Sequence, residues 1–191
     1  TTEYIFGAGG TLRMEPGTYY YIPKGNVDLA TSDADPIPRM SGLVNSPTSQ
    51  YYLNGGTIEL AGTGSSNGFQ SLRGNTTYPK NYINVTFSGA NTLGTDYKNL
   101  TSTVVIDSTL FITGDAIVNC HGLSTTTPQS FTGPGGLVMS GTNSRLRIRK
   151  LAVEQPELTG YNVDYSLTGG TVEFYSTTAT QQQLIRGNYT T

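Results

Sequence analysis

A ten-residue segment of this chain occurs twice, with six of its ten positions identical. Residues 51–60 read YYLNGGTIEL and residues 165–174 read YSLTGGTVEF, a shift of 114 residues. Similarity at a fixed distance is typical of repeat architectures, in which one unit cannot bury its apolar face alone and stacks on a neighbour. We therefore expect a chain of stacked units rather than one closed core.

Two shorter matches accompany this repeat. LRGN at 72–75 recurs as IRGN at 185–188, and FGAGGTLRM at 6–14 resembles FTGPGGLVM at 131–139. The second copy stops where the first continues into a strand-like run at 82–87. The expected organisation is a first unit at 1–130 with an irregular insertion at 22–50, a second, truncated unit at 131–191, and a chain that is a fragment of a longer array.

The composition favours strands over helices. Gly, Thr, Ser and Asn make up 83 of the 191 residues, and charged residues only 13%, against about 25% in an ordinary soluble domain. Good helix formers are scarce. Short β-rich runs separated by Gly, Asn and Asp have strand length, and they lie at 18–22, 57–60, 82–87, 103–106, 109–113, 116–120, 137–139, 145–149 and 171–175. No helix is predicted.

Strands recurring every 10 to 20 residues without helical crossovers fit two architectures, a sandwich of hairpins or a parallel β-solenoid. The spaced Gly-Gly-Thr-hydrophobic-Glu repeat favours the solenoid, as does the abundance of Thr and Asn that is typical of stacked turns. Two-residue Asn-Gly or Asp-Gly hairpin turns are scarce. We expect an all-β fold, specifically a right-handed parallel β-helix.

The run YINVTFSGANTLGTDYKNLTSTVVIDSTLFITGDAIVNCHG at 82–122, preceded by GGTIELAG, is similar to repeats in large surface proteins of Bacteroidota. In that family a Gly-Gly-Thr-hydrophobic-Glu-hydrophobic strand precedes a Tyr-x-x-hydrophobic-x-Val-x-Phe-Ser-Gly strand. The resemblance covers most of residues 51–191. These motifs are moderately specific, because unrelated solenoids use the same residues.

The resemblance implies an exported protein, carried by the type IX secretion system and held at the cell surface in association with the outer membrane. Gliding adhesins are among the members of this family. The expected partners are the type IX translocon or surface-anchoring proteins, together with polysaccharides or other surface ligands. Two features depart from the family pattern, the lack of a C-terminal sorting domain and the insertion at 22–50.

Parallel β-helices also host polysaccharide-degrading enzymes, so catalysis is the first alternative. Such a site needs several converging carboxylates with a His and a basic residue beside them. His121 and the basic run at 145–150 resemble parts of that pattern, but Asp107 and Asp115 are isolated beside turns. We expect no catalytic residues and no enzyme activity.

No metal or cofactor site is predicted. A calcium-binding solenoid needs Gly-Gly-x-Gly-x-Asp, and the glycine-rich segments at 7–10 and 133–136 lack the Asp. A looser calcium site formed by Asp28, Asp33 and Asp35 is the alternative to a polar surface loop. The single cysteine, Cys120, continues an apolar alternation and is expected in the core.

Tyrosines provide the candidate ligand contacts. Tyr19, Tyr20 and Tyr21 are consecutive, so at least one faces outward in a strand. Tyr51 and Tyr52 open the repeated segment. An exposed Tyr ring offers an apolar body with a polar tip. A carbohydrate-binding β-helix is therefore the second alternative.

The charge of the chain excludes one kind of partner, and its short apolar runs exclude one kind of segment. Its formal net charge is −2, which provides no basic surface for nucleic acid. No run of 18 apolar residues is present, so no membrane-spanning segment is expected. The sequence-based hypothesis is a structural or adhesive segment of an exported bacterial surface protein.

Overall fold

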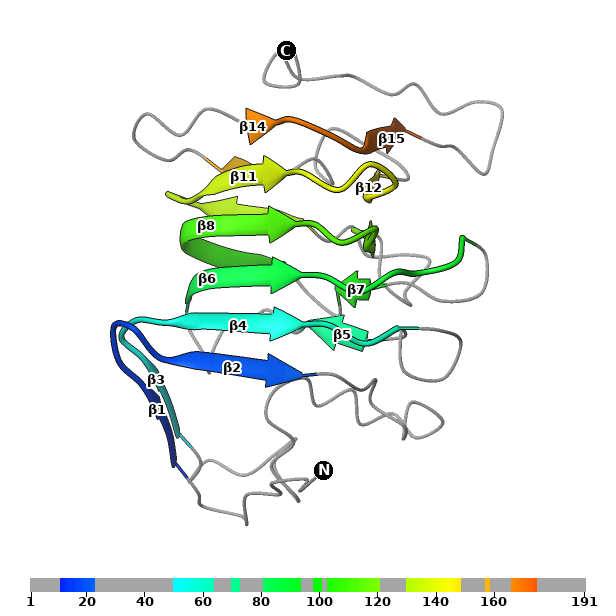
Figure 1. Cartoon of the computed structure of the whole chain (residues 1–191). Coiled ribbons are helices and arrows are strands. Elements are labelled where there is room, and N and C mark those ends of the chain that lie inside the picture. Colours follow the sequence, from blue (N-terminus) through cyan, green and yellow to red (C-terminus); the bar gives the residue numbers. More distant parts are fainter. Residues whose placement is uncertain are drawn as a thin grey trace.

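The computed structural model describes residues 11–22, 50–63, 70–72, 81–93, 98–100, 103–120, 130–148, 157–158 and 166–174. Within these ranges all regular structure is β-strand and none is helix (Figure 1). The prediction of an all-β fold is confirmed for this part of the chain. The strands are β1 Thr11–Met14, β2 Tyr19–Ile22, β3 Gln50–Leu53, β4 Thr57–Leu60, β5 Gln70–Leu72, β6 Tyr82–Phe87, β7 Lys98–Leu100, β8 Val104–Ile112, β9 Ile117–Asn119, β10 Phe131–Gly133, β11 Gly136–Met139, β12 Arg145–Ile148, β13 Glu157–Leu158, β14 Ser166–Leu167 and β15 Thr171–Phe174.

Every strand pairing in the described residues is parallel. The larger sheet has the order β13-β10-β8-β6-β4-β2, and β11 joins it through β8 and carries β14. The smaller sheet has the order β15-β12-β9-β7-β5, and β1 pairs with β3 separately. A hairpin sandwich requires antiparallel neighbours. The described residues therefore exclude that architecture.

The chain alternates between the two sheets as it advances. Strands β4, β6, β8, β11 and β14 of the larger sheet are followed in sequence by β5, β7, β9, β12 and β15 of the smaller sheet. Figure 1 shows the larger-sheet strands stacked in chain order from β2 to β14. The register joins Thr57 to Asn84, Asn84 to Thr109 and Thr109 to Gly136, which are 25 to 27 residues apart. Equivalent positions of these neighbouring parallel strands are therefore separated by a nearly constant length of chain.

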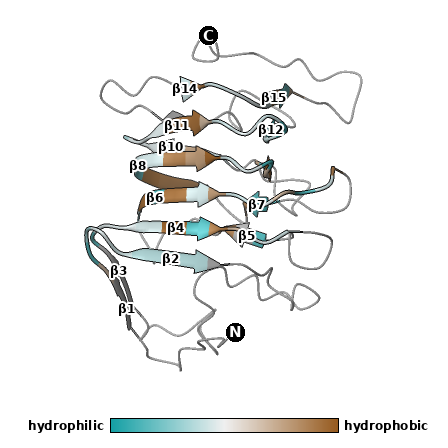
Figure 2. Cartoon of the chain, in the orientation of Figure 1, coloured by the Kyte–Doolittle hydropathy of each residue, from teal (hydrophilic) through white to brown (hydrophobic). Residues whose placement is uncertain are grey.

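A continuous cluster of apolar side chains covers the inner face of the larger sheet. Figure 2 shows hydrophobic residues concentrated in β6, β8 and β11. Alternate residues of β4, β6, β8 and β11 point inward and form two rows across the strands, and each of these side chains is between 0% and 3% exposed. One row is Ile58, Val85, Leu110 and Leu137, and the other is Leu60, Phe87, Ile112 and Met139. Burying one such aliphatic side chain contributes about 1.5–3 kcal/mol. Each strand adds to both rows, so burial accumulates along the stack.

The first copy of the repeat forms a tight corner between β3 and β4. Asn54 donates its backbone N–H to the Met14 carbonyl at 2.9 Å, and Thr57 donates to the Thr18 carbonyl at 3.0 Å. Gly56 lies between them with φ of +84°, where a Cβ would sit 2.6 Å from the Thr18 carbonyl oxygen. Glycine is required by both the backbone angle and the close approach.

The second copy repeats these contacts at the corner between β14 and β15. Thr168 donates its backbone N–H to the Met139 carbonyl at 2.9 Å, and Thr171 donates to the Ser144 carbonyl at 2.9 Å. Gly170 has φ of +87°, and a Cβ there would lie 2.6 Å from the Ser144 carbonyl oxygen. The repeated sequence therefore encodes a repeated corner.

The two corners do not occupy equivalent places in the two sheets. The first leads from β3, which pairs with β1, into β4 of the larger sheet. The second leads from β14, which extends the larger sheet, into β15 of the smaller sheet. The 114-residue sequence repeat therefore does not place its two copies at equivalent positions, because the same corner connects different pairs of strands.

The strands predicted from composition all occur, with small changes at their ends. The runs predicted at 103–106 and 109–113 form one strand, β8, which pairs with β10 through its first residues and with β11 through its last. The predicted insertion at 22–50 falls almost wholly outside the described residues. The division into units 1–130 and 131–191 stays a prediction.

Candidate functional site

The three consecutive tyrosines of β2 alternate between the two faces of the larger sheet. Tyr19 and Tyr21 are 59% and 55% exposed, whereas Tyr20 packs against the apolar core. Burial raises the pKa of the Tyr20 hydroxyl above its ordinary value. Of the three candidate ligand contacts in this strand, Tyr19 and Tyr21 are therefore accessible together on the outer face.

The other two candidate tyrosines lie in a different strand pair. Tyr51 and Tyr52 belong to β3, where their backbones are in register with Leu12 and Arg13 of β1. Their side chains lie outside the described part of the structure. A contribution of Tyr51 and Tyr52 to ligand contact stays a prediction.

Polar side chains from the next strands continue the outer face beside the two exposed rings. Tyr19 is in register with Thr57, and Tyr21 with Glu59. The following positions of β6 are Asn84 and Thr86. All four of these polar residues are partly exposed. The arrangement places hydroxyl, carboxylate and amide groups next to two aromatic rings.

Two hydrogen bonds hold this polar row in place. Asn84 donates from Nδ2 to the Gly56 carbonyl at 3.1 Å. The Ser88 hydroxyl donates to Oε1 of Glu59. The first bond joins β6 to the corner before β4, and the second joins β4 to the residue after β6, so both side chains are oriented before any ligand arrives. The sequence reasoning missed Glu59 and Asn84, although Glu59 is a fixed member of the repeated segment.

The carboxylates considered for catalysis have structural partners. Asp107 lies within β8 and accepts hydrogen bonds from Asn81 Nδ2 at 2.8 and 3.0 Å. Asp115 occupies the turn after β8 with φ of +62°, and its carboxylate accepts from the backbone N–H and Nδ2 of Asn143, both at 3.1 Å. Residues 108–112 of β8 and the turn residues 113–114 separate the two carboxylates along the chain. His121 lies outside the described residues.

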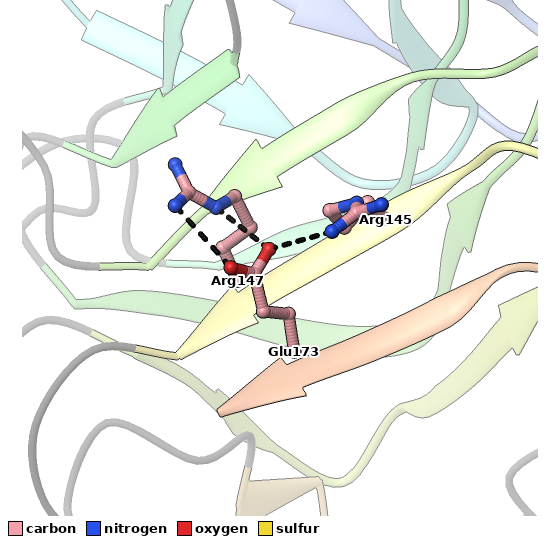
Figure 3. A network of polar contacts seen from close by, with 3 residues as sticks. All are labelled: Arg145, Arg147 and Glu173. Carbon is pink, nitrogen blue, oxygen red and sulfur yellow. Dashed lines mark hydrogen bonds and ion pairs between the residues drawn. The ribbon is translucent and has the colours of Figure 1, made fainter. Parts of the chain in front are cut away.

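The basic residues of β12 form ion pairs on the outer face of the smaller sheet (Figure 3). Arg145 Nη1 and Arg147 Nε approach Oε2 of Glu173 at 2.9 and 3.0 Å. The intervening Leu146 is fully buried. Basic and core positions therefore alternate along β12.

The two arginines also shift the titration of Glu173. Burial by itself would raise the pKa of this carboxyl group, but hydrogen bonds and charge from Arg147 and Arg145 outweigh burial and lower it. The three side chains are only 16% to 32% exposed. Since Glu173 accepts from both arginines, the cluster fastens β12 to β15.

Among the described residues no group of three His, Cys, Asp or Glu side chains is placed to hold a metal ion. The alternative calcium ligands Asp28, Asp33 and Asp35 lie outside the described part. Gly135 lies where a Cβ would come within 2.8 Å of the Ile106 carbonyl oxygen, so this glycine segment serves packing. Cys120 is fully buried, as predicted from the apolar alternation.

Two buried polar features were not foreseen from the sequence. Lys98 is fully buried, and its Nζ donates to the Gly62 carbonyl, while the Gly62 N–H donates to Gln70 Oε1 at 2.8 Å. Asn99 is also fully buried, and neither its Nδ2 nor its Oδ1 has a hydrogen-bond partner. Asn99 begins an Asn-x-Thr sequence, and its burial leaves no access for glycosylation in the folded chain.

No helix in the described structure has the length and apolar character needed to cross a membrane. A scan against protein-family models, a search of curated proteins and a search of solved structures each returned no match to this chain.

Proposed function

We propose that this chain is a structural and adhesive segment of an exported bacterial cell-surface protein, built as a right-handed parallel β-helix. The observation that carries the proposal is the pairing of the strands. From β4 through β6 and β8 to β11, parallel strands of the larger sheet recur every 25 to 27 residues, and the chain alternates between two sheets. A stack of rungs is the simplest path that connects such strands without helices.

The energetics of such a stack suit a mechanical role. Stability in repeat proteins is roughly the sum of terms within each repeat and between nearest neighbours, so a stack lengthens without needing a larger core. Here each rung contributes two residues to the apolar rows and parallel hydrogen bonds to its neighbours. The corner contacts of Gly56 and Gly170 lock successive rungs in register.

Export and surface location are supported by the resemblance of residues 51–191 to type IX-secreted surface proteins of Bacteroidota, including gliding adhesins. The expected partners are the type IX translocon, surface-anchoring proteins and surface polysaccharides. A catalytic role has weaker support, because Asp107 and Asp115 are each engaged by a neighbouring Asn.

The test uses the natural source of the chain. Peptide mapping of the intact parent protein is expected to give a polypeptide much longer than 191 residues, with further Gly-Gly-Thr-hydrophobic-Glu copies and a C-terminal sorting domain. Protease treatment of intact cells should release peptides of this segment, and deletion of the type IX translocon should abolish that release. A parent that stays inside cells of both strains would refute the proposal.

A further inference from the structure

The outer face of the larger sheet carries two neighbouring aromatic rings in the described residues. Tyr19 and Tyr21 have the two highest exposed fractions among the large hydrophobic side chains described. They stand two residues apart on one strand, a separation of about 6.6 Å. Exposed aromatic rings that are not needed for the core suggest a contact surface for a partner.

We propose that Tyr19 and Tyr21, with the polar row of β4 and β6, form a binding surface for an uncharged polysaccharide. Tyr rings provide a flat apolar surface with a hydroxyl at the tip. The face of a sugar ring that carries its C–H bonds can stack on such a surface, while its hydroxyl groups need hydrogen-bond partners beside it.

The partners stand in register next to the rings. Thr57 and Glu59 lie one strand away, and Asn84 and Thr86 lie two strands away. Neighbouring strands are about 4.7–4.9 Å apart. A glycan running across the strands would therefore meet aromatic rings on β2 and then rows of hydroxyl, carboxylate and amide groups on β4 and β6.

The charge of this face defines the class of glycan. Of the outward positions described on β2, β4, β6, β8 and β11, the charged residues are Glu59 and Asp107, both carboxylates, and Asp107 is hydrogen-bonded to Asn81. Since no cation stands at these outward positions of the described strands, the carboxylates repel anionic polymers such as polyuronates. A carboxylate accepts hydrogen bonds from neutral sugar hydroxyls, and charge-assisted bonds of this kind are the stronger ones. The face is therefore complementary to neutral sugars.

This inference rests on the proposed adhesive role, and its test needs only the purified chain. Native electrophoresis in gels containing dextran, hydroxyethylcellulose or yeast mannan measures retention by neutral polymers, and a polygalacturonate gel measures retention by an anionic one. We expect the chain to migrate more slowly in at least one gel that contains a neutral polymer. We expect polygalacturonate to leave its migration unchanged.

Variants identify the surface. Tyr19→Ala/Tyr21→Ala should weaken retention at least about tenfold, because truncating central aromatic contacts costs more than about 1 kcal/mol each. Tyr19→Phe/Tyr21→Phe keeps the rings and should retain most binding. Leu93→Ala, at an exposed residue in the loop after β6, is the matched control and should bind as the unchanged chain does. Circular dichroism checks that each variant keeps its strands.

Four results would overturn the inference. They are no retention in any neutral gel, equal retention of the double Ala variant, stronger retention in polygalacturonate, and self-association in polymer-free gels that the double Ala variant abolishes. The last result would assign the face to a second copy of the chain. None of these depends on where the parent protein is located, so failure here differs from failure of the proposed function.

Discussion

The two copies of the repeated segment have the same corner but different surroundings. In the first copy, Ile58 and Leu60 of β4 are 3% and 1% exposed. In the second, the equivalent residues Val172 and Phe174 of β15 are only partly buried. Strand β4 pairs with both β2 and β6, whereas β12 is the one strand that pairs with β15 in the described structure. Burial of the same motif therefore depends on how many neighbours it has.

The glutamate of the motif shows the same dependence. Glu59 accepts a hydrogen bond from the neutral Ser88 hydroxyl, while Glu173 pairs with Arg145 and Arg147. Both glutamates occupy the outward position two residues after the strand begins. The motif positions the carboxylate, and the neighbouring strand determines whether it contacts a hydroxyl or a cation. This difference gives one copy a polar, nearly uncharged face and the other an ion-pair cluster.

The largest expected difference comes from truncating the equivalent core residues. Leu60→Ala should lower the free energy of unfolding by about 2–5 kcal/mol, as a large-to-small change at a fully buried site does. Phe174→Ala should cost less, although Phe is the larger residue, because its side chain keeps part of its exposure in the folded chain. Urea denaturation of both variants measures the difference. A larger loss for Phe174→Ala would show that β15 is as well covered as β4.

A second prediction concerns the glycines of the corners. Gly56→Ala and Gly170→Ala should each destabilise the chain by more than the roughly 1–2 kcal/mol that the left-handed backbone costs a non-glycine residue. Each added Cβ would also meet a backbone carbonyl oxygen, that of Thr18 just before β2 or that of Ser144 just before β12. Thermal unfolding of the two variants should give similar losses.

Gly17→Ala is the matched control, because Gly17 has the same φ of +84° but no atom within 4 Å of an added Cβ. It isolates the cost of the backbone angle. Equal losses for Gly17→Ala and Gly56→Ala would show that the close approach between rungs contributes nothing.

The smallest expected effect is that of the ion pairs. Glu173→Gln should cost at most about 1 kcal/mol at neutral pH, since partly exposed pairs are screened by solvent. The folded-state pKa of Glu173 lies below its unfolded value, so the unfolded chain binds more protons in the acidic range. The contribution is present at neutral pH and is lost as pH falls through the folded pKa.

Urea denaturation at pH 7, 5 and 3 tests this sign. The stability difference between the unchanged chain and Glu173→Gln should shrink toward pH 3. In an Arg147→Gln background the same substitution should have a smaller effect, because one partner is already absent. A difference that stays constant from pH 7 to pH 3 would argue against a charged pair.

The strands with alternating β-branched or aromatic residues were predictable. Thr57–Leu60 and Tyr82–Phe87 occur with the predicted bounds, because their alternation is strong enough to indicate a buried face locally. Short strands such as Gln70–Leu72 and Lys98–Leu100 were missed. Their inward residues include Gln70 and Lys98, which are polar, so they carry no apolar period.

The candidate surface was predictable only in part. Consecutive tyrosines required at least one to face outward, and alternation was enough to anticipate that one ring packs inward. Which of the three packs inward depended on the register of β2 against β4. The roles of Glu59 and Asn84 also required that register, because these residues are far from the tyrosines in the sequence.

The sequence by itself determined the local elements of the described part of this protein: strands without helices, the corner with its two glycines, and the alternation that gives most strands one apolar face. These are local properties, set by backbone angles and by the period of the side chains. The tertiary structure alone decided that the two repeated corners occupy different sheets, which copy is fully buried, and which side chains surround Tyr19 and Tyr21. Parallel pairing joins residues 20 or more positions apart, and only the tertiary structure establishes which of them become neighbours.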